Sequence, residues 1–144
     1  MSAKLLFICT GNTCRSPMAE GLARVIFGWE EVRSAGLAAR DGLGASAEAV
    51  AVMQEMGIDL SGHRSQRITA ELMSWADWII PVTLAHEYRL CLLYPQYSTK
   101  LRYLGAWGEQ RRDIEDPWGG SLESYRQSAQ TISELLLSVK EKLS

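Results

Sequence analysis

The chain alternates between short apolar runs and longer amphipathic stretches. Residues 4–8 and 78–82 are short and continuously apolar, a pattern typical of buried parallel strands. Residues 31–36 and 100–104 are two further strand candidates. Pro81 cannot donate a hydrogen bond to a neighbouring strand, so we expect the far end of the third strand to be weak.

The stretches between these runs carry the signals of helix starts and stops. A serine or threonine that can cap the first turn stands where each helix is expected to begin, and Pro17 fits the first position of the first helix. Gly28 is placed to end that helix. In the last helix, apolar residues recur at alternating spacings of three and four. The expected caps are Ser16, Ser46, Thr83 and Ser121, a further short helix is expected from Thr69 to Trp75, and the last apolar face consists of Leu122, Tyr125, Ala129, Ile132, Leu136, Val139 and Leu143.

Strands that alternate with helices predict an α/β fold, a three-layer sandwich in which helices flank a parallel sheet. At this length, residues 1–144 are expected to form a single domain. In such sheets, ligands bind beyond the carboxyl ends of the strands. The segments expected at that edge are residues 9–16, Ser34, Thr83 and a long polar loop at 105–120.

Composition argues against several classes of function. The formal net charge of −2 gives no reason to expect nucleic acid or an anionic membrane as a partner. No apolar run reaches membrane-spanning length and the amino terminus lacks the pattern of a signal peptide, so we expect a cytoplasmic protein. The three cysteines, Cys9, Cys14 and Cys91, are too few for a disulfide framework and are not spaced as zinc ligands.

The candidate chemistry lies in residues 9–16, with the sequence Cys-Thr-Gly-Asn-Thr-Cys-Arg-Ser. A tight loop between a strand and a helix amino terminus directs backbone N–H groups and the helix dipole at a bound oxyanion. The same field favours a reactive thiolate at Cys9. Arg15 supplies two parallel donors for phosphate oxygens, and Gly11 and Asn12 tolerate the positive φ angles that such a loop needs. The pattern predicts phosphoryl transfer to sulfur.

Beyond this loop, the chain resembles the low-molecular-weight protein tyrosine phosphatase family in segments that follow the family's order. These segments are residues 9–16, 17–20, 33–36 and 57–65, and the pair Asp116-Pro117. The resemblance implies a four-stranded parallel sheet with flanking helices and a protein phosphatase that works through a phosphocysteine intermediate. It also implies a phosphorylated protein or peptide as substrate, inorganic phosphate as product, and no need for a metal or a cofactor.

The same resemblance assigns roles to individual residues. It implies that Cys9 is the nucleophile, that Arg15 clamps the phosphate and that Asp116 is the general acid. Asp113 and Glu115 are rival acids in the same loop, which the resemblance places behind Asp116. The phosphate-binding residues implied by the family are Thr10, Gly11, Asn12, Thr13, Cys14 and Arg15.

Three polar residues are expected to support the loop. The resemblance implies that Ser16 stabilises the thiolate of Cys9 through a hydrogen bond. It implies that Ser34 and His63 support Asn12 in an unusual backbone conformation. A simpler interpretation stays open for Ser34 and His63, because either residue can merely terminate a secondary-structure element.

The expected substrate depends on two departures from the common tyrosine-phosphatase pattern. Thr13 stands where enzymes for phosphotyrosine more often carry a bulky aliphatic residue, and Trp118 is followed by Gly-Gly-Ser where paired tyrosines are common. Both features are similar to the bacterial protein arginine phosphatase branch, which implies phosphoarginine as substrate and Thr13 and Trp118 as specificity residues. Phosphotyrosine is the alternative if Thr13 merely packs in the loop, and Trp118 is equally compatible with a place in the core.

Two further interpretations involve the cysteines. Thioredoxin-linked arsenate reductases share this fold and a similar loop, but they need two further cysteines, whereas Cys91 alone lies downstream of the loop. The intact Asp-Pro pair also favours a phosphatase over a reductase. Cys14 is either the partner of Cys9 in a protective disulfide or an inert small residue.

Overall fold

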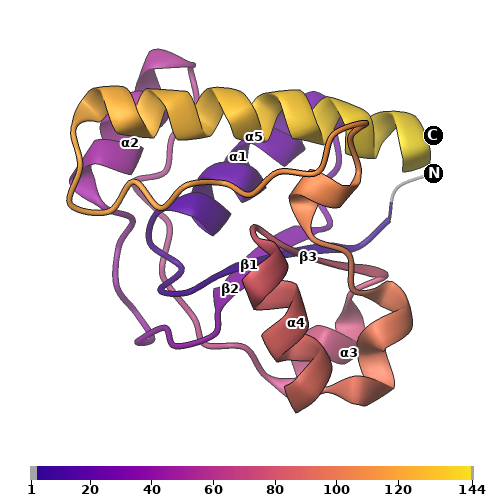
Figure 1. The fold of residues 1–144 in the computed structure, drawn as a ribbon. Coiled ribbons are helices and arrows are strands. Elements are labelled where there is room, and N and C mark those ends of the chain that lie inside the picture. The colour runs from indigo at the N-terminus through magenta and orange to yellow at the C-terminus, as the bar shows by residue number, and fades with distance from the viewer. Residues whose placement is uncertain (1–2, 144) are drawn as a thin grey trace.

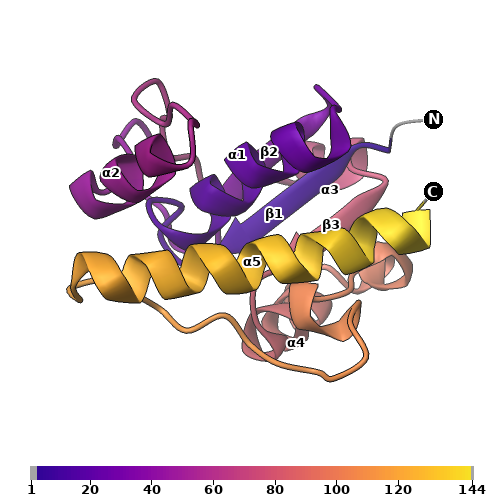
Figure 2. The same ribbon diagram turned by 90° about the horizontal axis from the view of Figure 1, so that it is seen from above.

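Three parallel strands form the central layer of the structure, and helices cover both of its faces (Figures 1 and 2). The computed structural model describes residues 3–143. The central strand β1 (Leu5–Cys9) pairs with β2 (Val32–Gly36) on one side and with β3 (Trp78–Pro81) on the other. Because Cys9 stands opposite Gly36 and all strands are parallel, their carboxyl ends share one edge.

The helices divide between the two faces of the sheet, as the three-layer prediction requires (Figures 1 and 2). One face carries α1 (Arg15–Phe27), α2 (Ala47–Glu55) and α5 (Leu122–Leu143), with the short 3₁₀ helix η2 (Leu104–Ala106) beside α5. The other face carries α3 (Ala70–Trp75), α4 (Leu84–Leu93) and the 3₁₀ helix η1 (Pro95–Lys100). Within residues 3–143, no helix combines the length and the apolar character needed to cross a bilayer.

The side chains of β1 supply both hydrophobic cores, because successive residues of a strand point to opposite faces of a sheet. Leu5, Phe7 and Cys9 belong to the cluster under α1, α2 and α5. Leu6 and Ile8 belong to the cluster under α3 and α4. This alternation places the side chain of Cys9 on the face of the sheet that α1 covers.

Residues 100–104 do not form the predicted fourth strand. A single parallel bridge joins Leu101 to Ile79 of β3, and the helices η1 and η2 begin or end on either side of it. The backbone N–H of Tyr103 donates to the carboxylate of Glu87 at 2.7 Å, so a side chain takes the place of a ladder partner. Within residues 3–143 the sheet therefore has three strands instead of four, and the prediction of an α/β fold with a parallel sheet flanked by helices is confirmed.

Three of the four predicted helix caps are confirmed, at Ser46, Thr83 and Ser121. Each capping hydroxyl accepts the backbone N–H three residues later, and Thr69 caps the short helix α3 in the same way. Gly28 ends α1 in a left-handed conformation, with φ at 70°, as its position in the sequence predicted. The helices of this fold therefore begin and end largely at locally encoded signals.

The prediction that Ser16 caps α1 is wrong, because the helix begins at Arg15, two residues before the predicted first position at Pro17. Cys14 occupies the capping position without a side-chain cap hydrogen bond, and its carbonyl accepts the N–H of Met18 at 3.2 Å. Pro17 consequently stands later in the first turn than predicted, where its missing N–H is still without cost. The hydroxyl of Ser16 faces the preceding loop instead.

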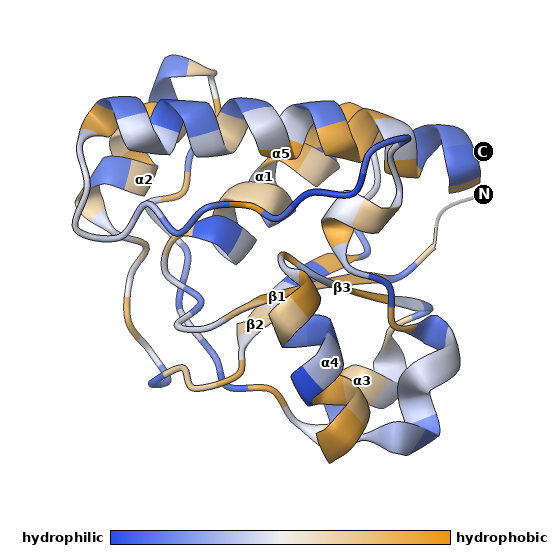
Figure 3. Ribbon diagram, in the orientation of Figure 1, coloured by the Kyte–Doolittle hydropathy of each residue, from blue (hydrophilic) through white to orange (hydrophobic). Residues whose placement is uncertain are grey.

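The loop between η2 and α5 closes the carboxyl edge of the sheet near Cys9. Its course is largely hydrophilic, whereas β1 and β3 beneath it are apolar (Figure 3). Ile114, which is 1% exposed, anchors this loop, and its N–H donates to the carbonyl of Val82 just after β3 at 3.3 Å. The anchor fixes the position of Asp116 two residues later.

We expect Gly105→Ala to lower the free energy of unfolding by about 3 kcal/mol, because a Cβ at this position has no room. Such an atom would lie 1.5 Å from the carbonyl oxygen of Arg112, so the loop backbone would have to move. Gly62→Ala is the matched control, because its Cβ meets nothing within 4 Å. Urea unfolding of both variants measures the difference, and equal midpoints would contradict this account.

Candidate active site

A pocket lies where β1 passes into α1, at the carboxyl edge of the sheet. Its volume is about 230 Å³. The phosphate-binding residues predicted from the sequence contribute most of its wall, and the loop before α5 contributes the rest. The lining residues are Cys9, Thr10, Gly11, Thr13, Cys14, Arg15, Asp116 and Trp118.

The peptide groups of residues 9–15 are oriented by donors that lie outside the loop. Five carbonyl oxygens of the loop accept hydrogen bonds from the surrounding chain, and in a trans peptide the N–H points opposite to the carbonyl. The following N–H groups therefore turn toward the concave side, which is the arrangement of an anion site. The pairs are Cys9 with the N–H of Leu37 (2.9 Å), Thr10 with Ala38 (2.9 Å), Asn12 with His63 Nε2 (2.8 Å), Thr13 with Ser46 (2.9 Å) and Cys14 with Met18 (3.2 Å).

The sulfur of Cys9 lies at the floor of this pocket within reach of two donors. The backbone N–H of Asn12 donates to Sγ at 3.2 Å, and Ser16 Oγ lies 3.0 Å from the same atom. Ser16 Oγ accepts a hydrogen bond from Asn12 Nδ2 at 2.8 Å, and its own proton has two acceptors within reach, the sulfur of Cys9 at 3.0 Å and the carbonyl oxygen of Ala35 at 3.4 Å, of which the sulfur is the nearer. Donors of this kind stabilise a thiolate more than a thiol. The serine predicted to support the nucleophile is thus in contact with it.

Asn12 is buried and adopts the left-handed backbone conformation, with φ at 56°. Asparagine tolerates this conformation better than most residues. Its side chain is fully bonded, because Nδ2 donates to Ser16 and to Ser34 (2.9 Å) and Oδ1 accepts the N–H of Gln66 at 3.0 Å. With the bond from His63 to its carbonyl, the structure brings both predicted supporting residues against Asn12.

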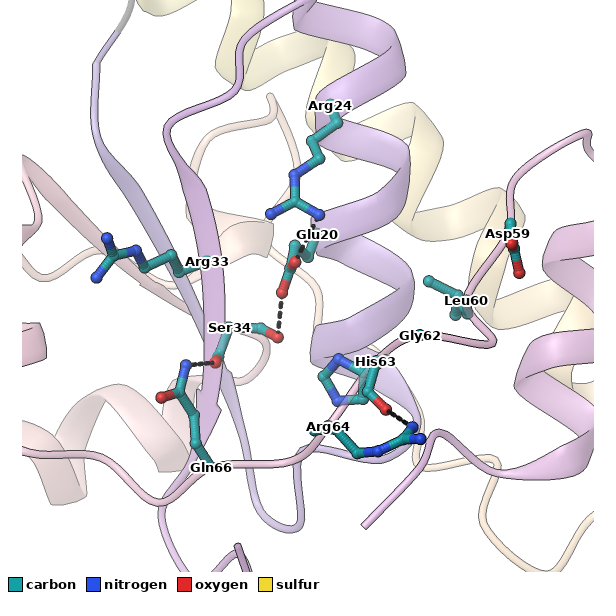
Figure 4. A pocket seen from close by; sticks show the side chains of 10 residues that line it. All are labelled: Glu20, Arg24, Arg33, Ser34, Asp59, Leu60, Gly62, His63, Arg64 and Gln66. Atoms are coloured by element: carbon teal, nitrogen blue, oxygen red, sulfur yellow. Dashed lines mark hydrogen bonds and ion pairs between the residues drawn. The ribbon is translucent and has the colours of Figure 1, made fainter. Parts of the chain in front are cut away.

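A second cavity, of about 360 Å³, lies behind the loop and exposes the support of Asn12 (Figure 4). In Figure 4 the hydroxyl of Ser34 points at the carboxylate of Glu20, to which it donates at 2.5 Å. The other oxygen of Glu20 pairs with Arg24 at 2.8 Å, one turn further along α1. His63 lies in the same view beside Arg64, whose guanidinium binds its carbonyl. The sequence analysis includes Glu20 in the segment 17–20 but assigns it no role. The structure shows that Glu20 accepts a hydrogen bond from Ser34.

Arg15 is held at the pocket by the loop that precedes α5. Its Nη1 donates to the carbonyl of Ile114 at 2.9 Å, and Nη2 lies 3.7 Å from Asp116 Oδ2. The arginine is 6% exposed, whereas the side chain of Asp116 is 56% exposed. The guanidinium is therefore fixed, and the carboxyl group beside it stays open to solvent and to a ligand.

The three candidate acids have different surroundings. Asp116 lines the pocket, and its Oδ1 accepts the N–H of Trp118 at 3.1 Å. Asp113 accepts the N–H of Leu84 at 2.8 Å and so is bound at the amino terminus of α4. Glu115 is exposed and lines a different pocket. The geometry therefore favours Asp116 among the three.

The two predicted specificity residues both face the pocket. Thr13 is half-buried in the loop, and Trp118 is 74% exposed at the mouth, so Trp118 is not a core residue. Their side chains line the same cavity as Cys9 and Asp116. A ligand bound in this pocket therefore lies beside both side chains.

Cys14 has polar neighbours that sequence reasoning did not assign to it. Its sulfur lies 3.4 Å from the hydroxyl of Tyr125 and 3.6 Å from that of Ser46, and these two hydroxyls are 3.3 Å apart. Burial raises the pKa of Tyr125 to about 12, so its hydroxyl stays neutral. The sequence identified Tyr125 as part of an apolar face, and its hydroxyl gave no signal of this contact.

His86 is the functional candidate that sequence reasoning missed. Its Nε2 lies 2.8 Å from the hydroxyl of Thr10, and its Nδ1 lies 2.6 Å from that of Thr83. Burial first, and then the positive charge of Arg15, lower its pKa to about 4. One feature of the sequence could have pointed to His86. It lies three positions after the expected cap Thr83, in the first turn of a helix that starts at the carboxyl edge of the sheet.

We expect the free energy of unfolding to depend on pH through the protonation of His86. An unfolded chain binds a proton at histidine near pH 6.5, whereas folded His86 binds it only near pH 4. Between these values the unfolded state holds more protons, so the free energy of unfolding falls as the pH is lowered, by about 3 kcal/mol in total.

Urea unfolding at pH 7 and pH 4 measures this loss, with His86→Gln as the comparison because glutamine does not titrate. The variant should lose about 3 kcal/mol less than the wild type over the interval. Above pH 6.5 the two proteins should show the same pH dependence. An equal loss in both proteins between pH 7 and pH 4 would mean that the pKa of His86 is not lowered by folding.

Proteins of one family match the chain over nearly its whole length. A model of the family described as low molecular weight phosphotyrosine protein phosphatase matches residues 4–144. A protein-arginine-phosphatase of Geobacillus stearothermophilus is 37% identical over 146 residues, which cover 99% of this chain and 97% of that protein. The low molecular weight protein-tyrosine-phosphatase Wzb of Escherichia coli strain K12 is 35% identical over 125 residues, which cover 87% of this chain and 84% of that protein.

Solved structures give the same result. A mutant of the YwlE arginine phosphatase with a phosphorylated active-site serine superposes with a TM-score of 0.91 at 36% sequence identity. The superposition covers 96% of this chain and 94% of that one. The fold and the sequence therefore agree on the same group of relatives.

Proposed function

The chain belongs to the low molecular weight phosphotyrosine protein phosphatase family, and from that premise we propose that it hydrolyses phosphoarginine in proteins. As a member of this family, the protein is a hydrolase that removes phosphate from phosphorylated proteins. The observation that carries the proposal is one pocket lined by Cys9, Arg15 and Asp116, which come from two segments about a hundred residues apart. Thiol, guanidinium and carboxyl group are the three functions that phosphoryl transfer to sulfur requires.

In the first step, the thiolate of Cys9 attacks phosphorus opposite the leaving group. A bond forms between sulfur and phosphorus while the bond from phosphorus to the guanidino nitrogen breaks. Asp116 gives its proton to that nitrogen. The N–H groups of the loop and the fork of Arg15 bind the equatorial oxygens, where negative charge accumulates in the transition state.

In the second step, water attacks the phosphocysteine. Asp116, now a carboxylate, takes a proton from the water, the bond between sulfur and phosphorus breaks, and inorganic phosphate leaves. Ser16 then donates its hydrogen bond to the departing thiolate, which lies 3.0 Å away. The half-exposed carboxyl group of Asp116 is accessible to both a leaving group and a water molecule.

The choice of phosphoarginine rests on Thr13 and on the Gly-Gly-Ser that follows Trp118 where tyrosine-specific relatives carry paired tyrosines. The hydroxyl of Thr13 offers a polar wall to a guanidinium and a partner to the attacking water, where an aliphatic branch would offer a dry surface to an aryl ring. The protein of Geobacillus stearothermophilus, 37% identical over almost the entire chain, is named a protein-arginine-phosphatase. The exposed ring of Trp118 is the feature that favours the alternative, phosphotyrosine, because it provides a surface on which a phenyl ring stacks.

The positions of the cysteines argue against arsenate reduction. Cys9 and Cys14 belong to the core on one face of the sheet, whereas Cys91 packs against the core on the other face. A disulfide relay from the loop to Cys91 would have to cross the sheet.

All three cysteines are free, which supports a place for this enzyme in the reducing cytoplasm.

We expect Asp116→Asn to lower kcat on phosphoarginine peptides by about 100-fold or more, because the leaving nitrogen loses its proton donor. Glu115→Gln is the control, since it removes a neighbouring charge that does not line the pocket, and it should change kcat by less than about twofold. The loss at Asp116 should be smaller on p-nitrophenyl phosphate, whose leaving group needs less protonation. Steady-state kinetics on both substrates measures these effects, and equal losses in the two variants would remove Asp116 from the mechanism.

We expect the wild type to hydrolyse phosphoarginine peptides faster than phosphotyrosine peptides of the same sequence. Thr13→Ile should lower kcat/KM on phosphoarginine and raise it on phosphotyrosine, because it replaces a polar wall with an apolar one. Phosphate release from both peptides, measured side by side, gives the two ratios. A wild type that prefers phosphotyrosine, with no change of preference in the variant, would leave the family chemistry intact and refute the arginine assignment.

A further inference from the structure

The imidazole of His86 joins helix α4 to the residue that follows the nucleophile. His86 Nε2 lies 2.8 Å from Thr10 Oγ1, and Nδ1 lies 2.6 Å from Thr83 Oγ1, the hydroxyl that caps α4. The backbone N–H of His86 donates to the same Thr83 oxygen at 3.1 Å. His86 is 9% exposed, so the orientation of its ring is fixed by these contacts and by packing.

Two polar groups of Thr10 form hydrogen bonds with two different parts of the structure. Its carbonyl accepts the N–H of Ala38, beyond β2, at 2.9 Å, and its hydroxyl is bound by His86. The residue is otherwise exposed at the pocket wall, so no packing fixes its side chain there. The two peptide groups that flank Thr10 carry N–H donors of the anion site next to Cys9. The first of these peptides is also fixed by the N–H of Leu37, which donates to the carbonyl of Cys9 at 2.9 Å, so the bond to His86 acts chiefly on the peptide between Thr10 and Gly11.

We propose that His86 is a positioning residue of the phosphatase, which holds the hydroxyl of Thr10 and so keeps the peptide groups beside Cys9 aimed at the bound phosphoryl group. The inference rests on the function proposed above, because it presumes that the loop binds the reacting phosphate. It adds a residue from α4 to a site otherwise built from β1, α1 and the loop before α5.

A neutral imidazole suits this task. It offers one N–H and one lone pair, so one of the two threonine hydroxyls donates to the ring and the other accepts from it. Burial and the charge of Arg15 keep the ring uncharged at neutral pH. His86 therefore orients Thr10 without placing a second full positive charge beside Arg15, and Arg15 remains the single cation among the residues that line the pocket within residues 3–143.

Two substitutions separate the contacts of His86, because the amide of glutamine reaches the position of Nε2 and that of asparagine the position of Nδ1. His86→Gln retains a partner for Thr10, whereas His86→Asn retains a partner for Thr83 alone. We expect His86→Asn to lower kcat on p-nitrophenyl phosphate about tenfold and to weaken competitive inhibition by inorganic phosphate by a similar factor. His86→Gln should stay within about threefold of the wild type in both measurements.

The same contact is tested from the loop. Thr10→Val removes the hydroxyl with little change of shape and should match His86→Asn, whereas Thr10→Ser keeps the hydroxyl and should lose less than Thr10→Val in both measurements. Because His86 acts through Thr10, the double variant His86→Asn with Thr10→Val should lose no more than either single variant. Urea midpoints at pH 7 serve as the readout of stability.

Each outcome decides the proposal. Equal losses in His86→Asn and His86→Gln, or losses that multiply in the double variant, would show that His86 does not act through Thr10. If the His86 variants do not fold, the exposed position of Thr10 keeps the test open, and a Thr10→Val protein with wild-type kinetics would overturn the inference. A wild type without phosphatase activity would refute the proposed function itself, which is a different result.

Discussion

Asn12 stands at φ 56° while every polar atom of its side chain is hydrogen-bonded inside the protein. A left-handed backbone is unfavourable for most residues unless the surroundings fix it. Here Ser16 from α1, Ser34 from β2 and the segment of His63 and Gln66 provide that support. Because this turn aims the N–H of Asn12 at the sulfur of Cys9 and its carbonyl at His63, the proposed nucleophile and the proposed anion site both depend on it.

The parallel sheet explains how residues so distant in sequence share one site. All three strands end at the same edge, so the loop after β1, the chain after β2 and the start of α4 after β3 meet there. The loop before α5 is attached to this edge by Ile114, which bonds to both Val82 and Arg15. The proposed nucleophile and acid are thereby held by separate anchors, and neither depends on direct contact between Cys9 and Asp116.

The polar groups around the pocket separate into charged and neutral ones. Arg15 is the one cation among the residues that line it within residues 3–143, and the proposed thiolate of Cys9 and the carboxyl group of Asp116 lie in the same lining. His86 and Tyr125 are neutral at pH 7, because burial lowers the pKa of the first and raises that of the second. Neutral groups orient their partners without adding a field that competes with the backbone N–H groups. In this arrangement the charge that meets a phosphate comes from Arg15 and from peptide dipoles, both of which are fixed before the ligand arrives.

The sequence alone determined what is encoded locally. Buried strands, the caps at Ser46 and Thr83, and a loop that joins a cysteine to an arginine depend on residues close together in the chain. Tertiary packing decided the rest, because hydrogen-bond partners distant in sequence leave no periodic signal. Glu87 takes the N–H of Tyr103 where a fourth strand was predicted, and the contact of His86 with Thr10 spans 76 positions. Neither pairing follows from residue type or spacing, since each exists only once the sheet has brought the segments together.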